Sequence, residues 1–178
     1  MNVSIEIYNG CLLLDDGTIR RQNLIIEGDT IARIGAEASL PGKRFDAHGM
    51  LVLPGIVDIH GDAFERQLMP RPGVFFPYEI AFHETDRQMV ANGITTAYHG
   101  LTYSWEPGLR GAESARKFLH AWEAQKSHLM CDTRLHLRFE TYNLKAVDEV
   151  TGWMDAGNVF GMNWTFRDTR PCWKPAPV

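Results

Sequence analysis

The sequence has few cysteines and no long apolar run. Three cysteines, Cys11, Cys131 and Cys172, are spread over 178 residues. An odd number of widely separated thiols does not make a disulfide framework, so we expect a reducing, cytoplasmic setting. The longest apolar stretches, such as residues 50–57, fall far short of the ~20 residues that span a bilayer. The first residues also lack the basic start and apolar stretch of a secretion signal, so we expect no membrane partner.

An excess of positive charge is also missing. Eighteen Lys and Arg residues face twenty-two Asp and Glu residues, which gives a formal charge of -4. No basic surface for nucleic acid is therefore expected. Hydrophobic residues make up 44% and charged residues 22%, the composition of an ordinary globular protein, which excludes wholesale disorder.

The first fifty residues show short strand patterns separated by turns. Val3, Ile5 and Ile7 alternate with polar neighbours, as in a half-buried strand. Residues 24–26 and 30–34 flank Glu27-Gly28-Asp29, a hairpin pattern in which Gly supplies the positive φ of the turn. We expect a small β-sandwich module over residues 1–53, too small to hold a large core alone.

From residue 54 to residue 159 the patterns alternate between strand and helix, which is typical of a parallel α/β array. The expected strands are 56–59, 94–98 and 135–139, and the expected helices are 79–91, 112–128 and 144–156. A closed (β/α)8 TIM barrel needs about 250 residues, so the sequence predicts an α/β fold with an incomplete barrel. Residues 160–178 show neither the helical nor the strand period of apolar residues and are predicted to form a divergent, irregular tail.

A histidine and an aspartate follow the first of these strands. His60 and Asp62 are two residues apart, so on a strand their side chains point the same way. An imidazole nitrogen and a carboxylate oxygen suit a divalent transition ion. Asp58, two residues earlier, is a candidate to orient the other ring nitrogen of His60. The alternative is a structural strand-end histidine, with an aspartate that caps the following loop.

The surrounding residues resemble a known family. The pattern Pro-Gly-x-x-Asp-x-His-x-Asp at residues 54–62 is similar to the first-strand motif of the amidohydrolase superfamily. More narrowly, residues 60–67 (HGDAFERQ), 69–74 (MPRPGV) and 135–140 (LHLRFE) resemble the α-D-ribose 1-methylphosphonate 5-triphosphate diphosphatases of the carbon–phosphorus lyase pathway. The resemblance covers roughly residues 3–159 and only the front half of such an enzyme.

This resemblance implies a divalent metal, zinc or a similar transition metal, with His60 and Asp62 as ligands. Glu140 matches the acidic position that holds or bridges the metal ions in that family. Without the resemblance, Glu140 is equally a helix-terminal charge ahead of Leu144, stabilised by the helix dipole.

The substrate class implied is a ribose that carries a phosphonate at one end and a triphosphate at the other. Such a densely anionic ligand needs guanidinium groups in fixed geometry, and Arg66, Arg71 and Arg138 lie in the matched motifs. Each of them is also compatible with a solvated surface. His99, at the end of strand 94–98, is a further candidate to face the site, or else a structural histidine.

The expected chemistry is hydrolysis of the triphosphate to the 5-phosphate and pyrophosphate. No histidine follows His136, so the later ligands and the general base of the family have no counterpart in this chain. We therefore expect a truncated member with an incomplete site. Two alternatives stay open: an amidohydrolase that acts on a carbon–nitrogen bond, and a non-catalytic remnant or assembly subunit. An exposed half-barrel would pair in a homo-oligomer or with a complementing C-terminal fragment.

Overall fold

The computed structural model describes residues 4–35 and 42–165 of the chain. Its contacts divide the chain into two compact units, Met1–Pro54 and Gly55–Val178. Within the described ranges, every helix is too short or too polar to cross a membrane.

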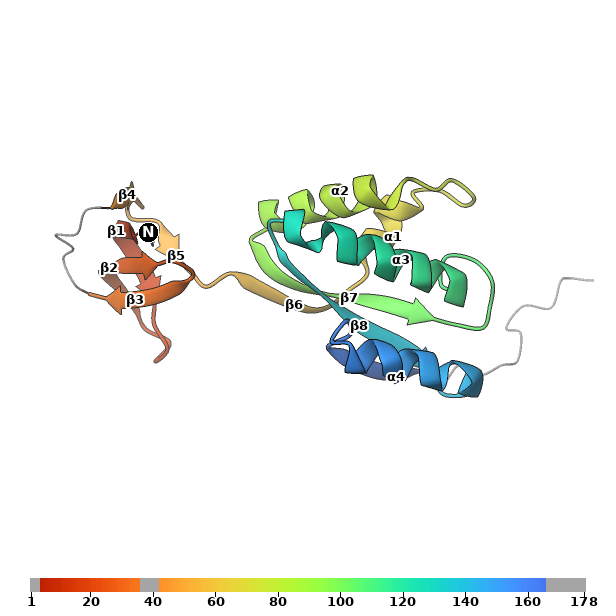
Figure 1. Cartoon of the computed structure of the whole chain (residues 1–178). Helices are drawn as coiled ribbons and strands as arrows, with labels where there is room; N and C mark the ends of the chain where they lie inside the picture. The colour runs from red at the N-terminus through yellow and green to blue at the C-terminus, as the bar shows by residue number, and fades with distance from the viewer. Residues whose placement is uncertain (1–3, 36–41, 166–178) are drawn as a thin grey trace, which may run out of the picture. The chain divides into compact units, whose positions relative to one another are not determined.

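The first unit is a five-stranded sheet in the order β3-β2-β1-β4, with β5 also paired to β1 (Figure 1). β1 is long enough for β4 and β5 to pair with it one after the other, both in parallel. The described part of the predicted β-sandwich is therefore a single sheet. Its strands are β1 (Ser4–Leu13), β2 (Ile19–Glu27), β3 (Thr30–Ile34), β4 (Lys43–Asp46) and β5 (Leu51–Val52).

The second unit is built on a parallel sheet in the order β6-β7-β8-β9. The sheet curls into a half-barrel, which confirms the predicted α/β fold with an incomplete barrel. The strands are β6 (Ile56–Gly61), β7 (Ile94–Tyr103), β8 (Asp132–Glu140) and β9 (Gly161–Thr165). The helices are α1 (Ala63–Leu68), α2 (Tyr78–Ala91), α3 (Ala112–Gln125) and α4 (Val147–Asp155), with 3-10 turns at Lys126–His128 and Leu144–Ala146.

The strand β9 corrects the expectation of an irregular segment from residue 160. Gly161–Thr165 pairs in parallel with β8, from His136 opposite Gly161 to Glu140 opposite Thr165. The run is too short to show a clear period, and the neighbouring edge of β8 supplies the hydrogen-bonding partners that make it a strand. The rest of the predicted tail, residues 166–178, lies outside the described residues.

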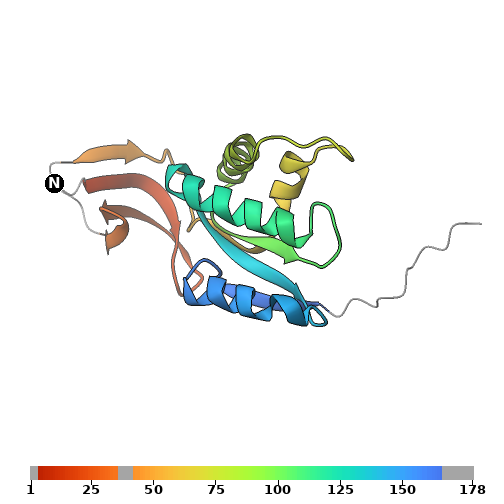
Figure 2. The ribbon, with the colours of Figure 1, turned by 45° about the vertical axis from the view of Figure 1, so that its right-hand side comes forward.

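The core of the second unit lies between the sheet and its helices, which run along one face of the sheet (Figure 2). Three phenylalanines form its centre: the ring of Phe118 lies 4.5 Å from that of Phe64 and 4.9 Å from that of Phe82, measured between centroids. Leu135 and Leu137 of β8 meet this cluster and are fully buried. Aromatic packing of this kind fixes the sheet against α1, α2 and α3.

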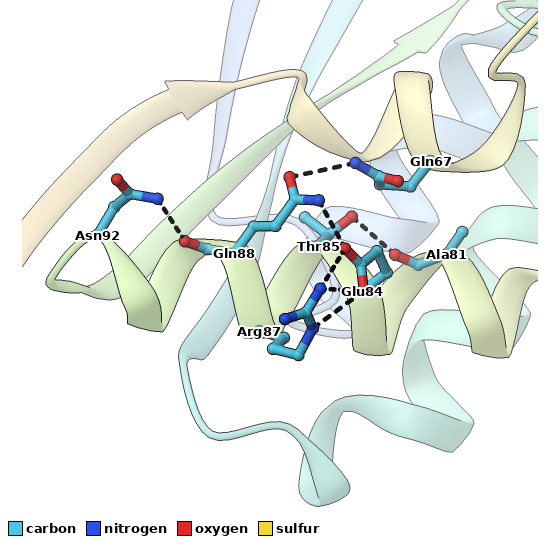
Figure 3. A network of polar contacts seen from close by, with 7 residues as sticks. All are labelled: Gln67, Ala81, Glu84, Thr85, Arg87, Gln88 and Asn92. Atoms are coloured by element: carbon cyan, nitrogen blue, oxygen red, sulfur yellow. Dashed lines mark hydrogen bonds and ion pairs between the residues drawn. The ribbon is translucent and has the colours of Figure 1, made fainter.

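A polar network on α2 links this helix to α1 (Figure 3). The Gln67 amide of α1 donates a hydrogen bond to Gln88 Oε1 at 3.2 Å, and Gln88 in turn donates to Glu84 at 2.6 Å. Arg87 completes the network through an ion pair with Glu84 at 2.8 Å. Since Arg87 is largely exposed, this network adds little stability and mainly orients the polar side of α2.

Candidate functional site

β6 ends in the segment that carries His60. Its pairing with β7 is irregular between Asp58 and Gly61, so the two-residue alternation is interrupted there. Asp58 Oδ1 accepts a hydrogen bond from the main-chain N–H of His60 at 3.1 Å. Asp58 thus fixes the backbone of His60, whereas the sequence suggested that it orients the imidazole. Asp62 lies beyond the strand, at the N-cap position of α1, and its side chain makes no capping hydrogen bond.

β8 presents two chemically different faces. Leu135, Leu137 and Phe139 point into the helix-covered core and are at most 2% exposed. Between them, His136 and Arg138 point to the opposite side, which we call the inner face of the sheet. The strict alternation of apolar and polar residues from residue 134 to residue 140 produces this separation.

Three side chains of the inner face converge over Gly100 of β7. The imidazole rings of His60 and His136 lie 5.0 Å apart between centroids, edge to face. A Cβ atom on Gly100 would lie 3.0 Å from His60 Cε1 and 3.5 Å from Arg138 Cδ. The absence of a side chain at Gly100 therefore makes the room that His60 uses. We call His60, His136 and Arg138 the inner-face cluster.

The surroundings of His60 favour its neutral form. Partial burial lowers the pKa of His60 below the ordinary 6.5, and the electrostatic influence of His136 and Arg138 lowers it further. The carboxylates of Asp62 and Asp58 oppose this effect without cancelling it. A neutral imidazole is the form that binds a metal ion or accepts a proton.

Glu140 lies away from this cluster. It is the last residue of β8 and is 3% exposed, and its Oε2 accepts a hydrogen bond from Ser104 Oγ at 2.9 Å. Four residues separate it from His136, which is about 13 Å along a strand that rises about 3.3 Å per residue. In the described ranges, no group of three or more His, Cys, Asp or Glu side chains is placed to hold a metal ion. The predicted ligand set of His60, Asp62 and Glu140 is therefore not brought together.

His99 faces the other side of the sheet, contrary to the expectation that it looks into the site. It is 2% exposed, and its ring lies edge-on to Phe64 of α1 at 5.4 Å between centroids. Burial lowers the pKa of His99 to about 4, so the ring is neutral. The physical reason is the pleat of β7, which directs His99 to the helices and Gly100 to the inner face.

The other predicted arginines are exposed. Arg66 lies in the last turn of α1, and Arg71 lies in the segment that joins α1 to α2. Neither is part of the inner-face cluster. Near Asp62 the structure places Arg110, a cation that the sequence did not single out. Arg110 forms an ion pair with Glu65 at 2.7 Å. The carboxylates of Glu65 and Asp62 both raise the pKa of Arg110.

A cavity of about 620 Å³ lies between the α1–α2 connection and the start of α3. Phe75, Phe76 and Trp105 line it together with Arg116, whose guanidinium is held by Glu149 at 2.6 Å. None of the predicted site residues lines this cavity. The inner-face cluster is therefore a separate feature.

The main residue that the sequence did not single out is His136. It belongs to the motif at residues 135–140, in which the family resemblance points only to Arg138 and Glu140. The signal was available, since in a strand with apolar residues at 135, 137 and 139 the residues 136, 138 and 140 share one face. Which of them meets His60 depends on the register between strands.

Comparison with known proteins finds curated relatives that match most of the chain. No family model matches the chain. It is 29% identical over 137 residues to the α-D-ribose 1-methylphosphonate 5-triphosphate diphosphatase of Escherichia coli, covering 75% of the chain and 36% of that protein. It is 27% identical over 127 residues to the allantoinase of Bacillus licheniformis, covering 71% of the chain and 26% of that protein.

Among solved structures, the fold is similar to that of N-acetylglucosamine-6-phosphate deacetylase from Pasteurella multocida. The TM-score is 0.53 at 18% identity, over 89% of the chain and 44% of that structure. The chain is thus a distant homologue of amidohydrolase-superfamily hydrolases. It spans about a third of the length of the diphosphatase that it matches.

Proposed function

We propose that the chain forms the first part of a hydrolase that acts on α-D-ribose 1-methylphosphonate 5-triphosphate in phosphonate catabolism. Water would add to a phosphorus of the triphosphate, the bond to the pyrophosphate leaving group would break, and the 5-phosphate would stay on the ribose. The similarity to the Escherichia coli diphosphatase supports this substrate. So do the three motifs at residues 60–67, 69–74 and 135–140.

The observation that carries the proposal is the contrast between two arginines of β8. Arg134 is neutralised by Asp132 at 2.7 Å and also donates to the Tyr98 hydroxyl at 3.1 Å. Among the side chains that the structure describes, Arg138 has no ion-pair partner, although it is half-buried beside two imidazoles. A half-buried guanidinium without an ion-pair partner is suited to bind an anionic phosphate or phosphonate group.

We further propose that the reaction depends on a divalent ion of the zinc type, with His60 and Asp62 among its ligands. Such an ion lowers the pKa of a bound water and neutralises developing charge. The described residues do not assemble the predicted three-ligand set. The part assigned to this chain is binding: Arg138 holds the anionic substrate, and the exposed Arg66 and Arg71 approach it from α1 and the following segment.

Exposed apolar residues on the edge strand β6 support a further protein partner. Ile56, Val57 and Ile59 are 55%, 55% and 73% exposed, whereas parallel sheets are normally covered on both faces. We propose that a complementing C-terminal fragment with the remaining barrel strands covers this edge. A clean monomer that stays monomeric when such a fragment is added would contradict this, and a stable homodimer would select self-association instead.

The test of the substrate is ³¹P nuclear magnetic resonance with the purified chain. We expect the triphosphate signals to shift on binding, and Arg138→Gln to weaken this binding at least tenfold. Arg134→Gln is the matched control and should bind as the native chain does. Equal binding by all three proteins would overturn the proposal. Turnover, if it occurs, should release pyrophosphate.

A second candidate is hydrolysis of a carbon–nitrogen bond, which the similarity to an allantoinase favours. Incubation with a cyclic amide such as allantoin separates the two. Release of a carboxylate from the amide, with neither binding nor hydrolysis of the triphosphate, would select this second function.

A further inference from the structure

We propose that the cavity between the α1–α2 connection and the start of α3 binds an uncharged, planar aromatic compound. The cavity is separate from the inner-face cluster, so this inference does not depend on the proposed hydrolase function. Its volume of about 620 Å³ lies within the roughly 300–1,000 Å³ of small-molecule sites in proteins.

Aromatic side chains line this cavity from two segments of the chain. Phe75 and Phe76 come from the α1–α2 connection, and Trp105 comes from the loop that follows β7. Their side chains are 56%, 49% and 46% exposed. A flat ring that enters the cavity can pack against the faces or edges of these rings and remove their apolar area from water.

The wall formed by the two phenylalanines is held in place by main-chain hydrogen bonds. The Phe76 N–H donates to the carbonyl oxygen of Leu68 at 2.9 Å, and the Val74 N–H donates to that of Arg71 at 3.0 Å. Gly73, with a φ of +78°, completes the turn between Arg71 and Val74. A wall that is already ordered lowers the entropy cost of binding a ligand.

The wall that carries Trp105 is anchored in the same way. The Ser104 N–H donates to the carbonyl oxygen of Arg110, and the Ala112 N–H donates to that of Ser104, both at 3.0 Å. Arg110 also ties this loop to α1 through its ion pair with Glu65 at 2.7 Å. The loop is therefore closed at its base and fixed to the neighbouring helix.

Tyr78 joins the cavity to the hydrophobic core. Its hydroxyl oxygen lies 3.4 Å from Ser114 Oγ of α3, and its ring centroid lies 6.2 Å from that of Phe118. Tyr78 and Ser114 both line the cavity. Packed side chains thus support the cavity from the side of the core.

The charges around the cavity favour an uncharged ligand. Arg116 is paired with Glu149 at 2.6 Å, and Lys117 is paired with Glu113 at 2.7 Å. An anion would have to compete with these carboxylates, and a cation would have to compete with the guanidinium or the ammonium group. A charged ligand that found no partner here would lose hydration without compensation. This arrangement differs from that of Arg138, to which we assign anion binding.

The test of the ligand class is a nuclear magnetic resonance titration of the full chain with two probes at pH 7. Naphthol is uncharged, and naphthalene sulfonate carries a negative charge on the same ring system. We expect naphthol to shift the main-chain signals of Phe76 and Trp105, and naphthalene sulfonate to bind at least fivefold more weakly. Equal or tighter binding of the sulfonate would overturn the proposed ligand class.

The test of the site uses substitutions of exposed aromatic residues. Phe76→Ala and Trp105→Ala should each weaken naphthol binding at least fivefold. Tyr142→Ala is the matched control, because Tyr142 is 68% exposed, follows β8 and does not line the cavity. This variant should bind naphthol within twofold of the native chain. Circular dichroism spectra of the three variants verify that they are folded.

Two results would refute the site itself. One is native affinity for naphthol in both Phe76→Ala and Trp105→Ala. The other is the absence of naphthol binding by the native chain at millimolar concentration. Shifts confined to Ile59 and its neighbours on β6 would also refute the site, because they would show adsorption to the exposed apolar edge strand.

Discussion

The two faces of the β6–β9 sheet differ in the side chains they carry and in what those side chains contribute to the protein. The helix-facing side carries large apolar side chains such as Leu135, Leu137 and Phe139, all at most 2% exposed. The inner face carries His60, His136 and Arg138 around a glycine. One strand, β8, supplies the three apolar residues and two of the inner-face residues, His136 and Arg138, from alternate positions. The stability of the unit therefore depends on one face, and its candidate chemistry on the other.

This contrast suggests that substitutions on adjacent residues of one strand should have very different consequences. A residue that faces the helices contributes buried apolar area. A residue on the inner face is partly solvated and contributes recognition instead.

The largest expected difference is between Leu137→Ala and Arg138→Ala. Leu137 is fully buried, so its truncation should lower the free energy of unfolding by about 2–5 kcal/mol. Arg138→Ala should change it by less than about 1 kcal/mol. Urea denaturation followed by circular dichroism measures both. Similar losses for the two variants would show that the inner face is also a packed core.

The second prediction concerns pH and His99, the histidine of β7 on the helix-facing side. Its pKa in the folded state is about 4, below the ordinary 6.5, because burial disfavours the charged ring. Below pH 6.5 the unfolded chain therefore binds a proton that the folded chain does not. The free energy of unfolding should fall by about 3 kcal/mol between pH 6.5 and pH 4 on this account.

Urea midpoints measured across this pH range test the prediction. In His99→Leu the part of the pH dependence due to this ring should vanish, whatever the stability of the variant at pH 7. His120→Leu, an exposed position on α3, is the control and should keep the native slope. An unchanged slope in His99→Leu would place the titrating group elsewhere.

The smallest expected effect is that of Gly100→Ala on the inner face. The added Cβ would lie 3.0 Å from His60 Cε1, so His60 must move, at a cost of about 1–3 kcal/mol. Gly152→Ala on α4 is the control: its Cβ would meet nothing within 4 Å, so stability should not decrease. Urea denaturation measures both variants, and native stability in Gly100→Ala would contradict the role given to this glycine.

Much of the fold follows from local patterns. The expected helix 79–91 is observed as Tyr78–Ala91, and the strand expected at 94–98 is the first half of Ile94–Tyr103. β9 was not predicted, because a short strand takes its hydrogen bonds from a neighbour rather than from its own pattern. The interruption of the alternation between Asp58 and Gly61 was also not visible in the sequence, since it arises in pairing with β7.

The sequence by itself determined the elements of this protein, because hydrophobic periodicity is a local property of the chain. It also determined that His60, His136, Arg138 and Glu140 stand on or beside strands of a parallel α/β unit. Only the tertiary structure decided which of them meet. The register of β6, β7 and β8 is set by packing between segments far apart in the chain, and it places His136 beside His60 and Glu140 beside Ser104. The same packing turned His99 from a candidate for the site into a member of the core.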